Sequence, residues 1–452
     1  MSLTFSKLSY GNLVVGVDTP VQLRNGKKER GINFDNAATT PPLVSVIEEI
    51  RNFAPFYSSI HRGAGYKAKI SSDKYEEARI TVMGFVGADT RKDVVVFVKN
   101  ATEAINKVAY RFAQETEYIN SETKQGKEKV VVLSTSMEHH SNDLPWRGKY
   151  EVDYIEVDEC GRLQFDDFVE KLEKYKGRVK LVTVAGASNV TGYINPVHRI
   201  AEWAHKYGAK ILVDGSQLIP HTPFDMKPAA SSKHIDFLVF SAHKMYAPFG
   251  IGVLIGPMDF FAKGSPDYAG GGTVKAVTHD RVIWSEPPSK DEAGTPNLMG
   301  VVALAAAIKT LSTIGMRNID KHEKALARQL IQGLKNIDCV EMYCTEDEGQ
   351  ERVGIVPFNM KAVPHEKLAE ILSGEAGIAV RSGCFCAHPY VQKLMNVHQD
   401  KIRNVMENPQ EPKPGMVRAS FGLYNEHKEV DQLLEVLHEI AKDRRRYLKM
   451  YE

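Results

Sequence analysis

Short β-branched runs alternate with helix-like segments through the middle of this 452-residue chain. The clearest runs lie at residues 94–98, 130–133, 181–184, 211–213, 237–240 and 252–255. Strands that alternate in this way with helical patterns are typical of strand–helix–strand units, whose strands lie parallel. The pattern therefore predicts an α/β fold with a mostly parallel sheet covered by helices.

One unit of this alternation can be delimited residue by residue. Asn195 is a good N-cap, Pro196 suits a first helical position and Gly208 ends the periodic stretch. Between them Ile200 and Ala204 share one helical face. The segment therefore predicts a helix between the strands at 181–184 and 211–213.

The pattern changes towards the C-terminus. Residues 298–314 are apolar nearly all round and predict a buried helix that joins two domains. Beyond them come charged amphipathic helices, strand candidates at 353–360 and 378–380, and a terminal helix with apolar residues from 430 to 440. Three prolines within 407–416 indicate a loop. The C-terminal third is therefore expected to form a smaller α+β domain.

The balance of charge argues against a nucleic-acid or anionic-lipid partner. Lys and Arg total 58 against 57 Asp and Glu, a formal charge of +1 at pH 7. The basic run at 444–446 is placed near the C-terminus of the last predicted helix, where it suits the helix dipole and a solvated face. We therefore expect a small-molecule partner and no nucleic acid.

Cysteine usage and the length of apolar runs predict a cytoplasmic protein. The five cysteines are an odd number spread thinly, unlike a secreted disulfide framework; they are Cys160, Cys339, Cys344, Cys384 and Cys386. The N-terminus has no basic signal-peptide region, and the longest apolar run, at 301–308, is far below the roughly 20 residues that a bilayer requires. We expect reduced thiols and no membrane span.

A lysine and an aspartate follow two of the predicted inner strands. Lys244 comes just after the strand at 237–240, in a turn with Ser241 and His243, where burial can make its amine nucleophilic. Asp214 ends the strand at 211–213, at the edge where open α/β sheets bind ligands, although an aspartate there can also cap a helix. Pyridoxal phosphate needs a Schiff-base lysine and a carboxylate beside its pyridine nitrogen, so the pair suggests that cofactor.

Two further segments supply what this cofactor also requires. Residues 99–106 follow the strand at 94–98 and offer a helix N-terminus for the phosphate, in which Thr102 is either a ligand or a plain N-cap. His139 and His140, at the end of the strand at 130–133, offer an imidazole for ring stacking. The alternatives for these histidines are a hydrogen-bonded strand-end pair or a fragment of a metal site.

Ordered segments along nearly the whole chain then resemble a known family. They are FDNAATT at 34–40, IHRG at 60–63, YEEAR at 75–79, NATEAIN at 100–106, MEHHSNDLPW at 137–146, SNVTG at 188–192, DGSQ at 214–217, SAHK at 241–244, EAGTPN at 292–297, RSGCFCA at 381–387 and RAS at 418–420. Each is weak alone, but their order resembles the class V aminotransferase-fold pyridoxal phosphate enzymes, and within them the cysteine desulfurase and selenocysteine lyase group.

This resemblance implies a fold type I pyridoxal phosphate enzyme. A large domain with a mostly parallel seven-stranded sheet would span 32–300, and a smaller α+β domain would combine 1–31 with 301–452. Lys244 would form the Schiff base, Asp214 would pair with the pyridine nitrogen, and Gln217 would hydrogen-bond the ring hydroxyl. His139 would stack on the ring and help to move protons.

The resemblance also assigns the two ends of the site. Residues that would hold the phosphate are Ala101, Thr102, Ser241 and His243, with Thr295 reaching it from a second subunit. That last role implies a homodimer. Asn189 and Arg418 would bind the carboxylate of an amino-acid substrate, with Arg418 as a bidentate fork.

Cys386 is the residue that separates a desulfurase from its transaminase-like relatives. By resemblance it is the nucleophile that takes sulfur from cysteine and carries it as a persulfide. With resemblance set aside, Cys384, Cys386 and His388 alternate, and in an extended chain they would point to one side and share a Zn²⁺. A buried, inert thiol is the other alternative, and a redox pair of the two cysteines is strained by the single residue between them.

Two departures from the family pattern leave the partner and substrate open. Residues 1–31 precede the first matching segment, and an insertion near 390–416 lengthens the distance from Cys386 to Arg418. The insertion would gate the site, alter the substrate or receive a sulfur-accepting protein. Competing functions are selenocysteine lysis, another class V reaction such as C–S lysis, epimerisation or transamination, and a non-enzymatic metal-binding or sulfur-carrying scaffold.

Overall fold

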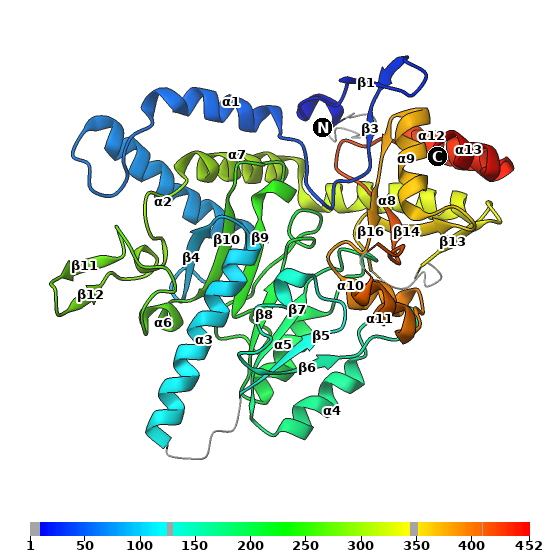
Figure 1. The fold of residues 1–452 in the computed structure, drawn as a ribbon. Helices are drawn as coiled ribbons and strands as arrows, with labels where there is room; N and C mark the ends of the chain where they lie inside the picture. Colours follow the sequence, from blue (N-terminus) through cyan, green and yellow to red (C-terminus); the bar gives the residue numbers. More distant parts are fainter. Residues whose placement is uncertain (1–9, 124–129, 344–350, 409) are drawn as a thin grey trace, which may run out of the picture.

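The central feature of the computed structural model, which describes residues 10–123, 130–343, 351–408 and 410–452, is a seven-stranded sheet (Figure 1). Its strands are β4 (Asp93–Val98), β5 (Val131–Thr135), β6 (Glu151–Ile155), β7 (Val179–Ala185), β8 (Lys210–Asp214), β9 (Phe237–Ser241) and β10 (Gly252–Pro257). The strand order is β4-β10-β9-β8-β7-β5-β6, and only β10 runs antiparallel to its neighbours. The predicted mostly parallel sheet is therefore confirmed.

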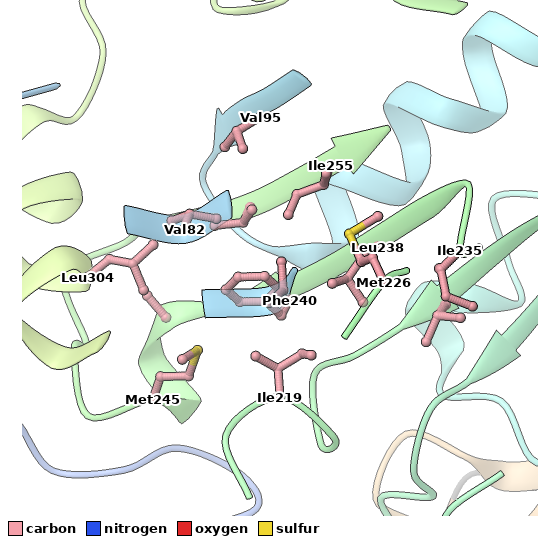
Figure 2. Packing of buried hydrophobic residues seen from close by; sticks show 14 of the residues in the cluster. Val82, Val95, Ile219, Met226, Ile235, Leu238, Phe240, Met245, Ile255 and Leu304 are labelled. Atoms are coloured by element: carbon pink, nitrogen blue, oxygen red, sulfur yellow. The ribbon is translucent and has the colours of Figure 1, made fainter. Parts of the chain in front are cut away.

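Helices cover both faces of this sheet because successive side chains along each strand point to opposite sides. On one face Leu238, Phe240 and Val95 pack with Val82 of α2 (Tyr66–Val86) and Leu304 of α7 (Leu298–Ile314) (Figure 2). The same core includes α5 (Val197–Lys206), while α1 (Val44–Phe53) packs against α7. Core residues on the other face lie in α3 (Ala101–Thr123) and α6 (Met258–Ala262). The buried residues of α4 (Phe165–Tyr175) belong to the first core, and this helix contacts β6.

The helix between β7 and β8 begins later than its sequence predicts. Pro196 is its N-cap residue and Val197 its first helical residue. The side chain of Asn195 instead donates a hydrogen bond to the carbonyl of Ala185, at the end of β7. The N-cap prediction for Asn195 is therefore wrong, because the N-cap position falls one residue later, at Pro196.

A second, smaller sheet forms the C-terminal part, with the strand order β13-β14-β17-β16. These strands are β13 (Val340–Met342), β14 (Ile355–Met360), β17 (Met416–Ser420) and β16 (Arg381–Gly383). Its core includes residues of α8 (Met316–Leu334), α9 (His365–Ala376) and α12 (His427–Lys442), and also Ile32 and Phe34. The chain ahead of the large sheet thus joins this core, where β3 (Ile32–Asn33) pairs with β15 (Ile378–Ala379). The division into domains at 31/32 and 300/301 stays a prediction.

The segment near 390–416 contains two helices that were not predicted. They are α10 (His388–Leu394) and α11 (Gln399–Glu407), and the proline-rich stretch from 408 to 415 follows, with Pro409 outside the described residues. Tyr390 anchors α10, since its hydroxyl donates to the carbonyl of Gly161 at 2.6 Å. The insertion is therefore seated on the turn between β6 and α4.

The basic run at 444–446 does not end the terminal helix. It opens a separate helix, α13 (Arg444–Met450), whose N-cap Asp443 accepts a hydrogen bond from the amide of Arg446. The predicted pairing with a helix C-terminus is therefore wrong. Asp443, a good N-cap residue, ends α12 at Lys442 and begins α13 at Arg444.

The remaining elements are short. They are β1 (Pro20–Gln22), β2 (Lys28–Arg30), β11 (Val274–Val277), β12 (Val282–Trp284), and single turns of 3-10 helix at η1 (Tyr10–Leu13), η2 (Ala54–Phe56), η3 (His140–Asn142), η4 (Ala242–Lys244) and η5 (Ser289–Asp291). In the part of the chain described here, no single helix is long and apolar enough to cross a membrane; α7 and α8 pass that test only as a pair bent by 78°. Cys160, Cys339, Cys384 and Cys386 are free, whereas Cys344 and the first nine residues lie outside the described residues.

Candidate active site

A pocket of about 260 Å³ opens where the carboxyl ends of the parallel strands face the smaller sheet. Every predicted site residue except Thr295 lines it: Ala101, Thr102, His139, Asn189, Asp214, Gln217, Ser241, His243, Lys244, Cys386 and Arg418. Parallel strands end at one edge of a sheet, so side chains far apart in sequence meet there. The two sheets together therefore assemble the site.

Lys244 and Asp214 reach the pocket from neighbouring parallel strands. Asp214 is the last residue of β8, and Lys244 lies in η4 directly after β9. Burial lowers the pKa of Lys244 to about 8, although the charge of Asp214 opposes that shift. A larger share of this amine is therefore unprotonated near neutral pH than in a lysine exposed to water.

His139 and Gln217 lie beside this pair. Burial, followed by the charge of Lys244, lowers the pKa of His139 to about 4, so its ring is neutral and suits stacking on an aromatic group. Gln217 donates from Nε2 to the carbonyl of Ala37 at 2.7 Å. Its Oε1 is buried and has no hydrogen-bond partner. A ring hydroxyl would satisfy that acceptor, so these residues fit the pyridine ring of pyridoxal phosphate.

Another part of the pocket wall lies at the N-terminus of α3. The amide of Ala101 donates to Oγ of Ser241 at 2.8 Å, and the hydroxyls of Thr102 and Ser141 are 2.7 Å apart. A Cβ on Gly252 would lie 2.6 Å from Cα of Asn100, so glycine is required where β10 meets the start of this helix. Backbone amides at a helix N-terminus, here with hydroxyls beside them, are groups that bind phosphate.

Arg418 supplies a cation at the far side of the pocket. Nη1 donates to the carbonyl of Asn189 at 2.8 Å, Nη2 lies 3.2 Å from Oδ1 of Asp35, and Nε is buried without a partner. Burial lowers the pKa of Arg418 to about 10. Burial also raises the pKa of Asp35, although the positive charges of Arg418 and Arg381 oppose that shift. The guanidinium therefore has a donor left for a carboxylate.

Cys386 lies in a tight turn after β16. Phe385 and Cys386 both have left-handed backbones, with φ of 52° and 54°, and the Cys386 side chain is exposed in the pocket. Cys384 differs, because its thiol donates to the carbonyl of Pro414 and burial raises its pKa to about 11. The environment of Cys386 is accessible and cationic, as a nucleophilic thiol requires.

The zinc alternative for Cys384, Cys386 and His388 required an extended chain. The left-handed turn at 385 and 386 removes the alternation of side chains on which that alternative depended. Within the described residues, no group of three or more His, Cys, Asp or Glu side chains is arranged to hold a metal ion. The extended geometry that the zinc alternative needs is therefore not found in this segment.

The sequence did not predict several residues that complete the site. Ala37, Ala185, Ala187 and Phe385 line the pocket, while Asp35 pairs with Arg418 behind it. Three of these five are alanines, which carry no chemical signal in a sequence. Thr295 is exposed and lies outside this pocket, and its role in the site of a second subunit stays a prediction.

Comparison with known proteins places the chain among enzymes of one type. The sequence model of the Aminotransferase class-V family matches residues 32–433. A cysteine desulfurase of Haloferax volcanii is 35% identical over 412 residues, which cover 90% of this chain and 88% of that protein. A probable cysteine desulfurase of Pyrococcus abyssi is 35% identical over 423 residues, covering 92% of this chain and 95% of its own length. The apo structure of a cysteine desulfurase from Thermococcus onnurineus superposes with a TM-score of 0.79 at 33% identity, covering 91% of this chain and 95% of its own.

Proposed function

Because the chain belongs to the class-V aminotransferase family, we propose that it is a pyridoxal-phosphate-dependent cysteine desulfurase. It converts L-cysteine to L-alanine and carries the sulfur as a persulfide on Cys386. The observation that carries this proposal is the exposed thiol of Cys386 in the same pocket as Lys244 and Arg418. A transaminase needs the lysine and the arginine, but it has no use for this thiol.

Residues at the carboxyl ends of the large sheet's strands would hold the cofactor. Lys244 would bind it covalently, Asp214 would keep its pyridine nitrogen protonated, and Gln217 would accept from the ring hydroxyl. His139 would stack on the ring. The start of α3 with Thr102, Ser241 and His243 would hold the phosphate. When bound, pyridoxal phosphate supplies a sink for the electrons released at Cα of the substrate.

The protein's own residues orient the substrate and move its protons. Arg418 and Asn189 bind the carboxylate, which fixes the amino acid relative to the lysine. Lys244, whose lowered pKa favours the free amine, would take the Cα proton. His139 is neutral and can accept or return a proton beside it.

Sulfur transfer balances without an external oxidant. The Cys386 thiolate attacks the substrate sulfur, an S–S bond forms, and the C–S bond breaks with its electron pair left on carbon. Protonation of that carbon completes alanine. The net change is L-cysteine plus the Cys386 thiol giving L-alanine plus the Cys386 persulfide.

Two partners follow from this proposal. A sulfur-accepting protein or small thiol must remove the persulfide, and α10 directly follows the turn that carries it. A second copy of the chain is the other partner. Exposed apolar side chains support a homodimer, since Tyr57, Tyr66 and Ile80 on or beside α2 and Val277 and Ile283 in the β11–β12 hairpin are 45% exposed or more. The cytoplasmic location stays a prediction from cysteine usage.

Product identity tests the proposal. Purified protein loaded with pyridoxal phosphate is incubated with L-cysteine, and the products are separated. Alanine together with a protein persulfide is the expected result. Pyruvate with ammonia would indicate elimination, a keto acid with loss of the cofactor's yellow colour would indicate transamination, and turnover of selenocysteine alone would indicate a lyase for that amino acid.

A further inference from the structure

The backbone at Cys386 needs support from its surroundings. Phe385 and Cys386 adopt the left-handed conformation in succession, which side chains other than glycine rarely do. Such a turn persists only where neighbouring groups hold it. Asn189 holds one side, since its Nδ2 donates to the carbonyl of Phe385 at 2.7 Å.

His140 holds the other side through two separate groups. Its main-chain amide donates to the carbonyl of Cys386 at 2.7 Å. Its ring Nε2 accepts a hydrogen bond from the amide of His388 at 3.3 Å, and the two imidazole rings meet edge to face with centroids 4.7 Å apart. One residue therefore binds the carbonyl of the nucleophile and the amide two residues beyond it.

The ring of His140 is suited to accept this bond. Burial, followed by the charge of His388, lowers its pKa; Asp143 opposes that shift and Arg147 adds to it. An unprotonated Nε2 can accept from an amide, whereas a protonated one cannot. His140 also directly follows His139, so one short segment fixes both the stacking imidazole and the turn that carries the thiol.

We propose that His140 is a positioning residue for Cys386, which holds the 385–388 turn so that the thiol meets the substrate sulfur. This inference rests on the proposed function. Misplacing a reacting group by about 1 Å can cost on the order of 100-fold in rate, so loss of the ring acceptor is expected to slow sulfur transfer while leaving substrate and cofactor binding intact.

Three variants of the pyridoxal-phosphate-loaded enzyme separate this role from packing. H140F keeps a ring but removes the acceptor, H140Q restores an acceptor, and H388A removes the partner ring but keeps the His388 amide position. We expect H140F to lower kcat and the single-turnover rate of persulfide formation roughly 10- to 100-fold, with an unchanged KM for cysteine and unchanged cofactor absorbance. H140Q and H388A should stay within about threefold of the wild type.

Several results would overturn the inference while leaving the proposed function standing. They are wild-type persulfide formation in H140F, a loss in H388A or H140Q as large as in H140F, and loss of cofactor from H140F, which would assign His140 to cofactor binding instead. Failure of the wild type itself to form alanine and persulfide is a different outcome, because it removes the proposed function and this inference with it.

Discussion

Cys384 and Cys386 are two residues apart, yet their surroundings assign them different roles. Cys386 is exposed in the cationic pocket, whereas the Cys384 thiol donates a hydrogen bond to the carbonyl of Pro414 and has a raised pKa. Cys386→Ser should keep the yellow cofactor but lose the persulfide and nearly all alanine release from cysteine. Cys384→Ser is the matched control and should retain both. Persulfide labelling with alkylating reagents and alanine analysis measure the difference.

The reverse pattern would assign the nucleophile to the other thiol. If Cys384→Ser alone removed the persulfide, the turn described at Cys386 would not carry the chemistry. Residual activity of the Cys386 variant on selenocysteine would not contradict the assignment, because selenium is a better leaving group and can depart without thiolate attack.

Cofactor uptake should follow the ionisation of Lys244. Only the unprotonated amine attacks the aldehyde of pyridoxal phosphate, and burial lowers the pKa of Lys244 from 10.5 to about 8. The rate at which cofactor-free protein turns yellow should therefore rise with pH through about 8 and level off above it. Stopped-flow absorbance measures this rate, with free Nα-acetyl-lysine as the control. A protein profile that still rises near the lysine's ordinary pKa would contradict the buried amine.

The sequence predicted which residues form the site, but not how those residues contact one another. Lys244 and Asp214 were derived from their places after inner strands, while Gln217, Asn189 and Arg418 came from resemblance; all line one pocket. The hydrogen bond between Arg418 and Asp35 joins residues 383 positions apart in the chain, and no local sequence pattern predicts such a contact.

Among the elements, the contact between β10 and the start of α3 requires glycine at position 252. A Cβ at Gly252 would lie 2.6 Å from Cα of Asn100, so Gly252→Ala must displace the start of the helix that holds the phosphate. Overpacking of this kind costs about 1–3 kcal/mol, which predicts cofactor binding weaker by roughly 5- to 150-fold if the displaced helix start bears that cost. Equilibrium titration with pyridoxal phosphate measures it.

Gly84→Ala is the control for that substitution. Gly84 lies inside α2, and nothing stands within 4 Å of the Cβ that alanine would add. Replacing a helical glycine by alanine should raise the free energy of unfolding by about 1 kcal/mol and leave the cofactor affinity unchanged. Equal cofactor affinities in the two variants would show that the β10–α3 contact does not shape the phosphate site.

Elements with strong patterns were predicted, and those that depend on distant pairing were not. The inner strands and α7 follow from apolar runs and periodicity. β6 has half-buried residues rather than a continuous apolar run, and the two-residue strand β3 exists only because it pairs with β15, the strand predicted at 378–380. α11 has no buried residue, so its apolar pattern carried little signal among the polar residues of the insertion.

At the scale of the whole molecule, the site is expected to need a second copy of the chain. Thr295 is exposed and outside the pocket of its own chain, and its loop is fixed by the amide of Gly294, which donates to the carbonyl of Gly271 at 2.8 Å. If Thr295 completes the phosphate site of the partner subunit, dissociation should release cofactor. Analytical ultracentrifugation at the assay concentration should find a dimer. A fully active monomer would contradict this.

The large-scale arrangement was the part least accessible to sequence reasoning from residues alone. Alternating strands predict a sheet, but they do not say that Cys386 and Arg418, from the smaller sheet, face the edge that carries Lys244. That placement depends on packing between the two sheets, and the order of family segments supplied it only by resemblance.

The central claim is that substrate sulfur passes to Cys386. L-Cysteine labelled with a heavy sulfur isotope is added to the cofactor-loaded enzyme, and trypsin cuts after Arg381 and Lys393 to give one peptide with both thiols. Fragment masses then show which cysteine gained a sulfur atom. We expect one labelled sulfur on Cys386 for each alanine formed in a single turnover. Alanine formed with no labelled sulfur on this peptide, or with the label on Cys384, would contradict it.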